Sequence, residues 1–295
     1  MQDKKSNSNF NHLHKMSILE IVQMMNEEDT TVARTVKKSL PKITDAIELI
    51  VDQLKNNGRL FYVGAGNSGR IGVMDACECV PTFGTPPELV QSIIAGGQNA
   101  TNKSHENVED RTEEGRLALK QVAINKNDVV VGISASGTTP FVLAAIDYAR
   151  EKDSATIGFS CSVPSPLLEN VNVAIGVKVG PEILSGSTRL KAGTAQKMIL
   201  NMISTAVMVK LGKVYQNMMV DVQTNNNKLL QRACKIVMEL GEVNKKEASE
   251  LLIKTGNQIK IAILMAKFGL NLESANKRLE SVGGYLDQIL DDSKL

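Results

Sequence analysis

The chain has 295 residues, enough to bury a substantial core in one large domain and a smaller one. Its 42% hydrophobic and 22% charged residues are typical of a soluble globular protein. A net charge of +2 without a sustained basic cluster argues against a nucleic-acid-binding surface. No apolar run approaches the ~18 residues that a membrane helix needs, and the polar residues 1–16 are unlike a signal peptide. We expect a cytoplasmic protein that binds neither nucleic acid nor membrane.

Four cysteines, Cys77, Cys79, Cys161 and Cys234, are spread along the chain. They match neither a disulfide framework nor a zinc pattern, because Cys77-x-Cys79 is tighter than the usual spacing of zinc ligands. We therefore expect reduced thiols and no metal site.

The amino-terminal part, residues 1–55, has a helical pattern. Apolar residues recur every three or four positions from Ser17, which is predicted to cap the helix because Glu20 follows three residues later. A second helix is predicted over about 31–56, bent or broken at Pro41. We interpret this segment as packing and subunit contacts rather than chemistry.

From residue 56 to 222 the pattern changes to short β-rich runs separated by helices. This alternation predicts an α/β fold with a doubly wound parallel sheet, in which ligands collect at the carboxyl ends of the strands. The predicted strands are 60–63, 90–95, 128–133, 155–160 and 171–177, and the predicted helices are about 69–79, 112–122, 140–151 and 188–211.

A glycine-rich turn follows the first predicted strand. Gly66, Asn67, Ser68 and Gly69 stand between this strand and the start of a helix. Backbone N–H groups at such a helix start point outward with the positive end of the helix dipole behind them. The turn therefore predicts an anion cradle, most readily for a phosphate.

The spacing of Gly64, Gly66 and Gly69 also matches the dinucleotide-binding fingerprint. That fingerprint expects an acidic residue at the end of the second strand, about 20 residues further on. The second predicted strand instead ends in two glycines, and Glu88 lies before it, at the wrong end. We therefore favour a phosphate cradle and predict no cofactor.

Two further polar turns follow strands of the same sheet. The first holds Ser134, Ser136, Gly137, Thr138 and Thr139, and two such turns at one sheet edge predict a phosphorylated small ligand. The second of them, residues 180–197, is the third polar turn counted from the glycine-rich turn; it carries further candidate binding residues and leads into a helix. Cations near a helix start oppose its dipole, so either an anionic partner or a solvated surface fits this turn. Its candidates are Glu182, Ser185, Ser187 and Lys191, with Arg189 as a further cation.

Residues 223–295 lose the strand pattern. They predict three or four short helices, with helix starts at Asn244 and Asn271. We interpret this part as a small helical domain for assembly or for covering the site.

Many of these segments together resemble the N-acetylmuramic acid 6-phosphate etherases, bacterial enzymes built on the sugar isomerase (SIS) fold and related to the glucokinase regulatory protein. The long signature at 185–197 is the most specific of them. Three positions depart from the family pattern: Asn67 replaces Thr, Thr138 replaces a common Arg, and Val80 replaces Pro. The resembling segments are 25–29, 64–70, 75–79, 94–97, 109–110, 134–137, 180–182, 185–197, 212–214 and 219–222.

The resemblance implies cleavage of the ether between C3 of the phosphorylated sugar and D-lactate, in peptidoglycan recycling. Family correspondence makes Glu78 the general acid that assists lactate departure and Glu109 the general base at C2. A general acid must keep its proton near neutral pH, although an ordinary glutamate has a pKa of about 4.3. We therefore predict that Glu78 occupies the drier environment.

Helix geometry adds one constraint on Glu78. In a straight helix it lies about 14 Å beyond Gly69, further than C6 is from C3 in a sugar. Either the helix bends early or the site is shared with a second subunit, and we favour an active site at a homodimer interface. A non-catalytic phosphosugar sensor and an aldose–ketose isomerase are the alternatives to an etherase.

Overall fold

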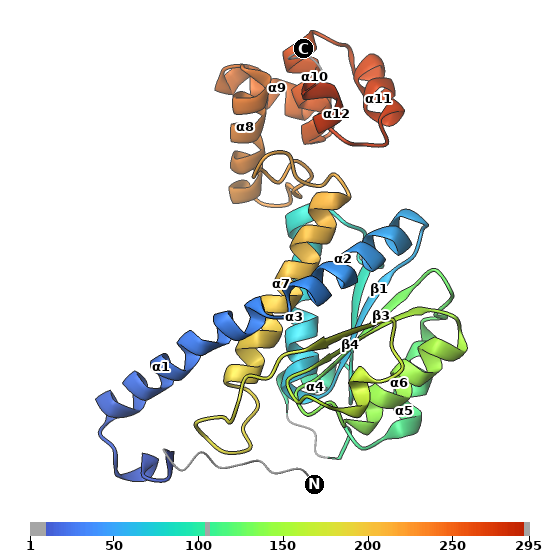
Figure 1. The fold of residues 1–295 in the computed structure, drawn as a ribbon. Helices are drawn as coiled ribbons and strands as arrows, with labels where there is room; N and C mark the ends of the chain where they lie inside the picture. The colour runs from blue at the N-terminus through green and yellow to red at the C-terminus, as the bar shows by residue number, and fades with distance from the viewer. Residues whose placement is uncertain (1–9, 104–106, 292–295) are drawn as a thin grey trace. The chain divides into compact units, whose positions relative to one another are not determined.

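The computed structural model describes residues 10–103 and 107–291 (Figure 1). The chain separates into two compact units, and the division falls inside helices α3 (Gly66–Phe83) and α7 (Lys191–Lys210). The first unit holds the chain up to Cys77 and Glu88–Ser204, and the second holds Glu78–Pro87 and Thr205–Leu295. Among the helices of the described ranges, none is both long and apolar enough to cross a membrane.

The first unit is built on a five-stranded parallel sheet in the order β2-β1-β3-β4-β5. The three central strands are buried along their whole length, as expected when helices cover both faces. The predicted doubly wound sheet is confirmed, with small shifts at the strand ends. The strands are β1 (Leu60–Gly64), β2 (Val90–Ile94), β3 (Val129–Ser134), β4 (Ala155–Ser160) and β5 (Val173–Gly176).

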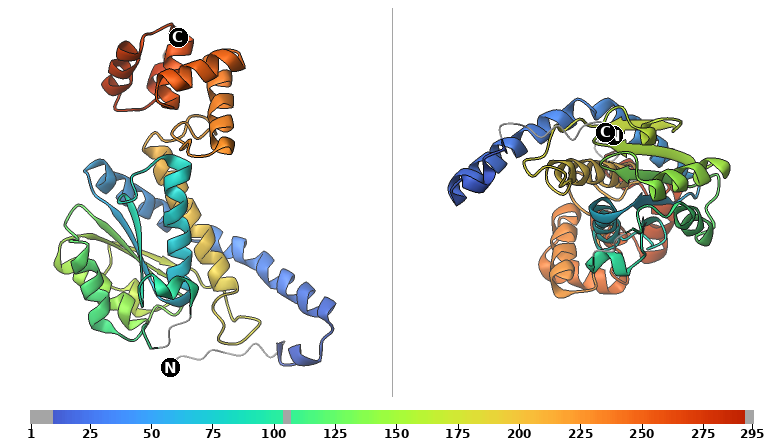
Figure 2. Two further views of the ribbon diagram at one scale, coloured as in Figure 1. Left: turned by 180° about the vertical axis from the view of Figure 1, so that it is seen from behind. Right: turned by 90° about the horizontal axis from the view of Figure 1, so that it is seen from below.

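Helices cover the two faces of this sheet (Figures 1 and 2). On one face, α5 (Thr112–Gln121) and α6 (Pro140–Glu151) bury an apolar cluster that includes Phe61 and Val130. On the other face, α3 approaches closely at Gly72, where an added Cβ would lie 3.1 Å from the Cβ of Tyr62. The remaining short helices of this unit are α4 (Asn99–Asn102) and the 3-10 turns Leu13–Lys15 and Pro166–Leu168.

The amino-terminal helices are α1 (Ile18–Lys37) and α2 (Leu40–Lys55). The predicted cap is confirmed, because Ser17 and Glu20 form a reciprocal capping box. The predicted start of the second helix near residue 31 is wrong, since α1 continues through it to Lys37. The predicted break near Pro41 is confirmed, because the two helices separate at Lys38 and Ser39 and Pro41 stands in the first turn of α2. The Ser39 hydroxyl donates to the Gly176 carbonyl at 2.9 Å. The predicted polar tail lies mostly outside the described residues.

The second unit is helical. Its apolar core is drawn from all its helices of ten or more residues and includes Val237, Leu252 and Ile263. The predicted starts at Asn244 and Asn271 are confirmed, since both side chains accept backbone N–H bonds. Up to Asp291, where the described residues end, five helices follow α7 instead of three or four: α8 (Asn227–Gly241), α9 (Lys245–Lys254), α10 (Ile259–Phe268), α11 (Leu272–Ser281) and α12 (Asp287–Leu290).

Candidate active site

The glycine-rich turn forms as predicted between β1 and α3. Gly66 has a φ of +53°, which favours glycine, and an added Cβ on Gly69 would lie 2.6 Å from the Ile94 side chain. Ser68 is buried, and its hydroxyl accepts a hydrogen bond from the Gln196 side chain of α7 at 2.9 Å. Asn67 is partly exposed. The turn therefore presents the outward N–H groups of a helix start next to a rigid glycine corner.

The hydroxyl-rich turn after β3 is held by its own side chains. The Ser134 hydroxyl lies 2.8 Å from the Thr139 hydroxyl and accepts from the Gly137 N–H at 3.0 Å. Thr138 donates its hydroxyl to that of Ser136 at 2.9 Å, and both residues are exposed. The backbone and hydroxyl groups are thus ordered at the carboxyl edge of the sheet, where the fold collects ligands.

Gly137 is required by its surroundings. Its φ is +67°, and a Cβ on it would lie 2.2 Å from the Ser165 hydroxyl oxygen. The Leu167 N–H also donates to the Gly137 carbonyl at 3.0 Å. The loop after β4 therefore packs directly on the hydroxyl-rich turn and fixes its shape.

Two charged groups of the third polar turn, Glu182 and Lys191, are already bonded within the protein. Both oxygens of Glu182 accept backbone bonds at the start of α7, from Lys191 at 2.9 Å and Ala192 at 3.0 Å. The Lys191 ammonium is buried and pairs with Glu28 of α1 at 2.5 Å. A solvated surface is therefore wrong for Lys191, and the protein itself supplies the anionic partner. Arg189 is exposed.

The third turn lies against the glycine-rich turn. A Cβ on Gly193 would lie 2.9 Å from the Asn67 amide nitrogen and 3.8 Å from the Thr188 carbonyl oxygen. Of the other predicted residues in this turn, Ser187 is partly exposed and Ser185 is exposed. The first unit thus brings two of the three predicted turns into contact.

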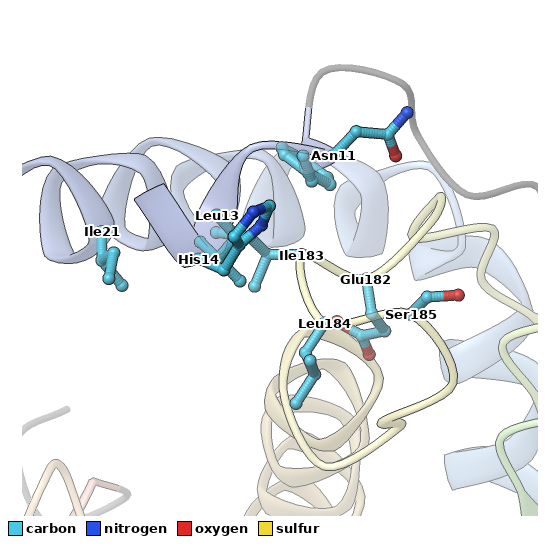
Figure 3. Close-up of a pocket in the computed structure, with 9 residues that line it drawn as sticks. Asn11, Leu13, His14, Ile21, Glu182, Ile183, Leu184 and Ser185 are labelled. Carbon is cyan, nitrogen blue, oxygen red and sulfur yellow. The ribbon is translucent and has the colours of Figure 1, made fainter. Parts of the chain in front are cut away.

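Ser185 borders a hollow of about 480 Å³ between the chain's first helical turns and residues 182–185 (Figure 3). Leu13, His14 and Ile21 form its other wall. Figure 3 shows that polar and apolar side chains both line it, Asn11, His14, Glu182 and Ser185 beside Leu13, Ile21, Ile183 and Leu184.

Both predicted catalytic glutamates are exposed. Glu78 belongs to α3, which is an uninterrupted helix from Gly66 to Phe83, so an early bend is excluded. Glu109 is tied through its carbonyl, which accepts from Phe141 N–H at 3.0 Å at the start of α6. The expectation of a drier environment for Glu78 is wrong for the chain by itself, because the helix face that carries it is open to solvent.

Asp75 on α3 is a buried charge that the sequence reasoning missed. Its carboxylate accepts from Asn201 and Ser204 of α7 and from the Tyr62 hydroxyl of β1. Burial raises the pKa of Asp75 to about 6. The signal was available, since Asp75 shares a helical face with buried Gly72 and Cys79 and is thus a carboxylate at a core position.

Family models match this architecture. Residues 42–150 match the glucokinase regulatory protein N-terminal SIS domain, 102–206 the SIS domain, and 216–261 the C-terminal lid domain of glucokinase regulatory protein. A solved phosphoheptose isomerase from Francisella tularensis has the same fold, with a TM-score of 0.51 at 18% identity over 65% of this chain and 98% of that one. The fold and its loops define a SIS-domain protein.

Sequence relatives narrow this class. The N-acetylmuramic acid 6-phosphate etherase of Pasteurella multocida is 46% identical to this chain, and the match covers 95% of this chain and 93% of that protein. The etherase of Clostridium beijerinckii is also 46% identical, over 95% of this chain and 92% of that protein. A third, from Pectobacterium atrosepticum, is 48% identical over 94% and 92%. The chain belongs to the N-acetylmuramic acid 6-phosphate etherase family. It is accordingly an enzyme, a carbon–oxygen lyase, and the reading as a non-catalytic sensor is set aside.

Proposed function

We propose that Glu78 and Glu109 carry out the proton transfers of the etherase reaction, which converts N-acetylmuramic acid 6-phosphate and water into N-acetylglucosamine 6-phosphate and D-lactate. The sugar first opens, so that C1 becomes an aldehyde and the hydrogen on C2 becomes acidic. Glu109 removes that proton, and the C3–O bond then breaks with its electron pair leaving on the lactate oxygen. Glu78 protonates this oxygen, and D-lactate departs.

The second half of the reaction restores both carboxyl groups. Water adds to C3 of the unsaturated aldehyde while the ionised Glu78 accepts a proton from it. Glu109 returns its proton to C2. Overall, one ether bond and one water molecule are converted into one hydroxyl on the sugar and one hydroxyl on lactate. Atoms and charges therefore balance without a redox step.

Substrate binding is proposed for the polar turns of the first unit. The start of α3 and the hydroxyl-rich turn after β3 offer neutral donors to the 6-phosphate, and such donors at a sheet's carboxyl edge favour a phosphate. The observation that supports this most is the glycine-enforced shape of both turns, at Gly66 and Gly137. Glu182 and Lys191 are proposed to shape the site from the third turn, because their charges are already engaged.

We further propose that the active site is completed in a homodimer. The first half of α1 extends away from the sheet (Figures 1 and 2) and exposes Ile18, Leu19 and Val22 at 83%, 63% and 51%. An exposed apolar helix face of this kind is typical of a surface that meets another chain. Glu78 is exposed in the single chain, and a second copy that covers it would supply the drier environment that a general acid needs.

Mixed dimers test both the residue roles and the shared site. Glu78→Gln and Glu109→Gln chains are inactive alone on this proposal, whereas Glu113→Gln, at an exposed glutamate of α5, keeps its activity. If one site uses carboxylates from two subunits, equal mixing restores up to about a quarter of the activity, since half the dimers carry one intact site. Full activity of either single variant would contradict the residue roles, and inactive mixtures would contradict sharing between subunits.

We place this activity in cytoplasmic amino sugar catabolism that recycles peptidoglycan. The chemistry of the product supports this placement, because the product is a sugar that still carries its phosphate, which intracellular metabolism can use. A deletion strain that accumulates the phosphorylated muramic sugar inside the cell would bear this out, and accumulation of the unphosphorylated sugar outside the cell would contradict it.

A further inference from the structure

Asp75 is a buried carboxylate at the seam between α3 and α7. Its side chain is only 4% exposed, and its Oδ1 accepts from Asn201 Nδ2 at 3.1 Å and from Ser204 Oγ at 3.0 Å. The Tyr62 hydroxyl of β1 bonds to the same carboxylate. Three elements of the first unit therefore meet at one ionisable group.

The same two helices are joined a second time at the glycine-rich turn. Ser68 lies seven positions before Asp75 on α3, on the same helix face, and it accepts from Gln196 of α7 at 2.9 Å. The contact between Ser68 and Gln196 belongs to the glycine-rich turn, and α7 begins at Lys191 within the third polar turn. The contacts at Ser68 and at Asp75 thus limit how far α3 can slide or turn against α7. They thereby fix the relative position of the glycine-rich turn and the third polar turn, which touch at Gly193.

A charge at this position is costly for the fold. The other titratable groups that act on it are Tyr62 from β1 and Lys197 from α7, whose charge favours the ionised form. Burial acts in the opposite direction and is the larger influence, so the carboxylate ionises only near pH 6. An uncharged amide could keep the Oδ1 acceptor without this cost. A purely structural seam does not need the charge.

We propose that Asp75 is a positioning residue, whose ionised carboxylate locks α3 to α7 and so holds the glycine-rich turn in register with the third polar turn for phosphosugar binding. This inference rests on the proposed function of those turns. Charge-assisted hydrogen bonds are shorter and stronger than neutral ones, so the lock tightens when Asp75 is ionised. It follows that substrate capture by this enzyme depends on the ionisation of a group that does not touch the substrate.

The test compares the wild type, Asp75→Asn and Asp128→Asn from pH 5 to pH 8. Asp128 is a matched control, because it is buried in the same unit but pairs with Arg59 next to the opposite, amino-terminal ends of β1 and β3. Lactate release gives kcat/KM at each pH. The second ionisation of a sugar phosphate also falls near pH 6, but it affects all three enzymes equally and cancels in the ratio of wild type to variant.

We expect the ratio of wild type to Asp75→Asn to be largest at pH 8, carried mainly by KM, and to fall by up to about tenfold towards pH 5, where about a tenth of the carboxylate is ionised. The ratio for Asp128→Asn stays flat. A flat ratio for Asp75→Asn, or an equal slope for both variants, would overturn the proposal.

Ser204→Ala provides a second, independent variant should Asp75→Asn fail to fold. It removes one donor to the carboxylate and leaves the charge, so the pH dependence of kcat/KM moves to higher pH relative to the wild type. An unmoved profile would overturn the proposal. If the wild type releases no lactate, the proposed function fails separately, and the affinity for inorganic phosphate over the same pH range still decides the role of Asp75.

Discussion

The replacement of Asp75 by Asn makes a prediction about stability that runs against the usual effect of losing a buried hydrogen-bonded group. The carboxyl has a pKa of about 6 in the folded chain, raised from 3.8 mainly by burial. A raised acid pKa means that the folded state binds the proton more tightly than the unfolded state. The ionised carboxylate therefore costs stability above pH 6, and the cost fades as the pH falls towards 4.

The size of this cost follows from the shift. A difference of about 2.2 pKa units, at 1.36 kcal/mol per unit, amounts to about 3 kcal/mol when Asp75 is fully ionised. At pH 5 the same calculation leaves about 1.6 kcal/mol. Asn keeps an oxygen to accept from Asn201 and Ser204, so most of the hydrogen bonding survives. We expect Asp75→Asn to be more stable than the wild type at pH 7.5, by up to about 3 kcal/mol.

Urea unfolding at pH 7.5 and pH 5 measures this directly. The gain in unfolding free energy of Asp75→Asn should shrink by about 1.4 kcal/mol between the two pH values, because every other group titrates alike in both proteins. A variant that is less stable than the wild type at pH 7.5, or a difference that is independent of pH, would refute the reasoning. A gain in stability together with a loss of activity would mark Asp75 as a charge kept for function.

Three further predictions concern the turns and the thiols. Glu182→Gln should lower the unfolding free energy in urea by about 1 kcal/mol, because the start of α7 loses its charged cap, and an unchanged midpoint would argue against the cap. Gly137→Ala should cost at least about 1–2 kcal/mol from its positive φ and weaken phosphate binding, since its methyl group would meet Ser165; phosphate affinity equal to the wild type would contradict this. Iodoacetamide at pH 8 should modify the exposed Cys77 and spare Cys161, because burial raises the pKa of Cys161 to about 12; mass spectrometry that finds Cys161 modified first would contradict the burial.

The parallel sheet was predictable because strands buried on both faces leave continuous apolar runs with polar turns between them. The capping box at Ser17 and the caps at Asn244 and Asn271 were also predictable, since each depends on a side chain bonding within its own first turn. The length of α1 was not. Local spacing placed the start of a second helix near residue 31, whereas α1 continues to Lys37; the break itself was predictable, because Pro41 favours the first turn of a new helix.

The polar turns of the candidate site were predictable from the sequence, but the hydrogen bonds and ion pairs that connect them to the rest of the fold were not. The roles of Glu182 and Lys191 depend on partners found only in the folded chain, the α7 backbone and Glu28, which lies 163 residues from Lys191 in sequence. Asp75 illustrates the same limit. A buried carboxylate is visible in a helical pattern as an exception, whereas the residues that satisfy it come from α7, 126 and 129 positions further along.

The proposed roles of Glu109 as general base and Glu78 as general acid are tested most directly by deuterium exchange at C2. Substrate is incubated in D₂O with Glu78→Gln or with Glu109→Gln, recovered, and examined by NMR for deuterium at C2. Proton removal at C2 precedes lactate departure, so Glu78→Gln should incorporate deuterium without releasing lactate, and Glu109→Gln should do neither. Exchange by Glu109→Gln, or no exchange by Glu78→Gln in a folded protein, would contradict the account.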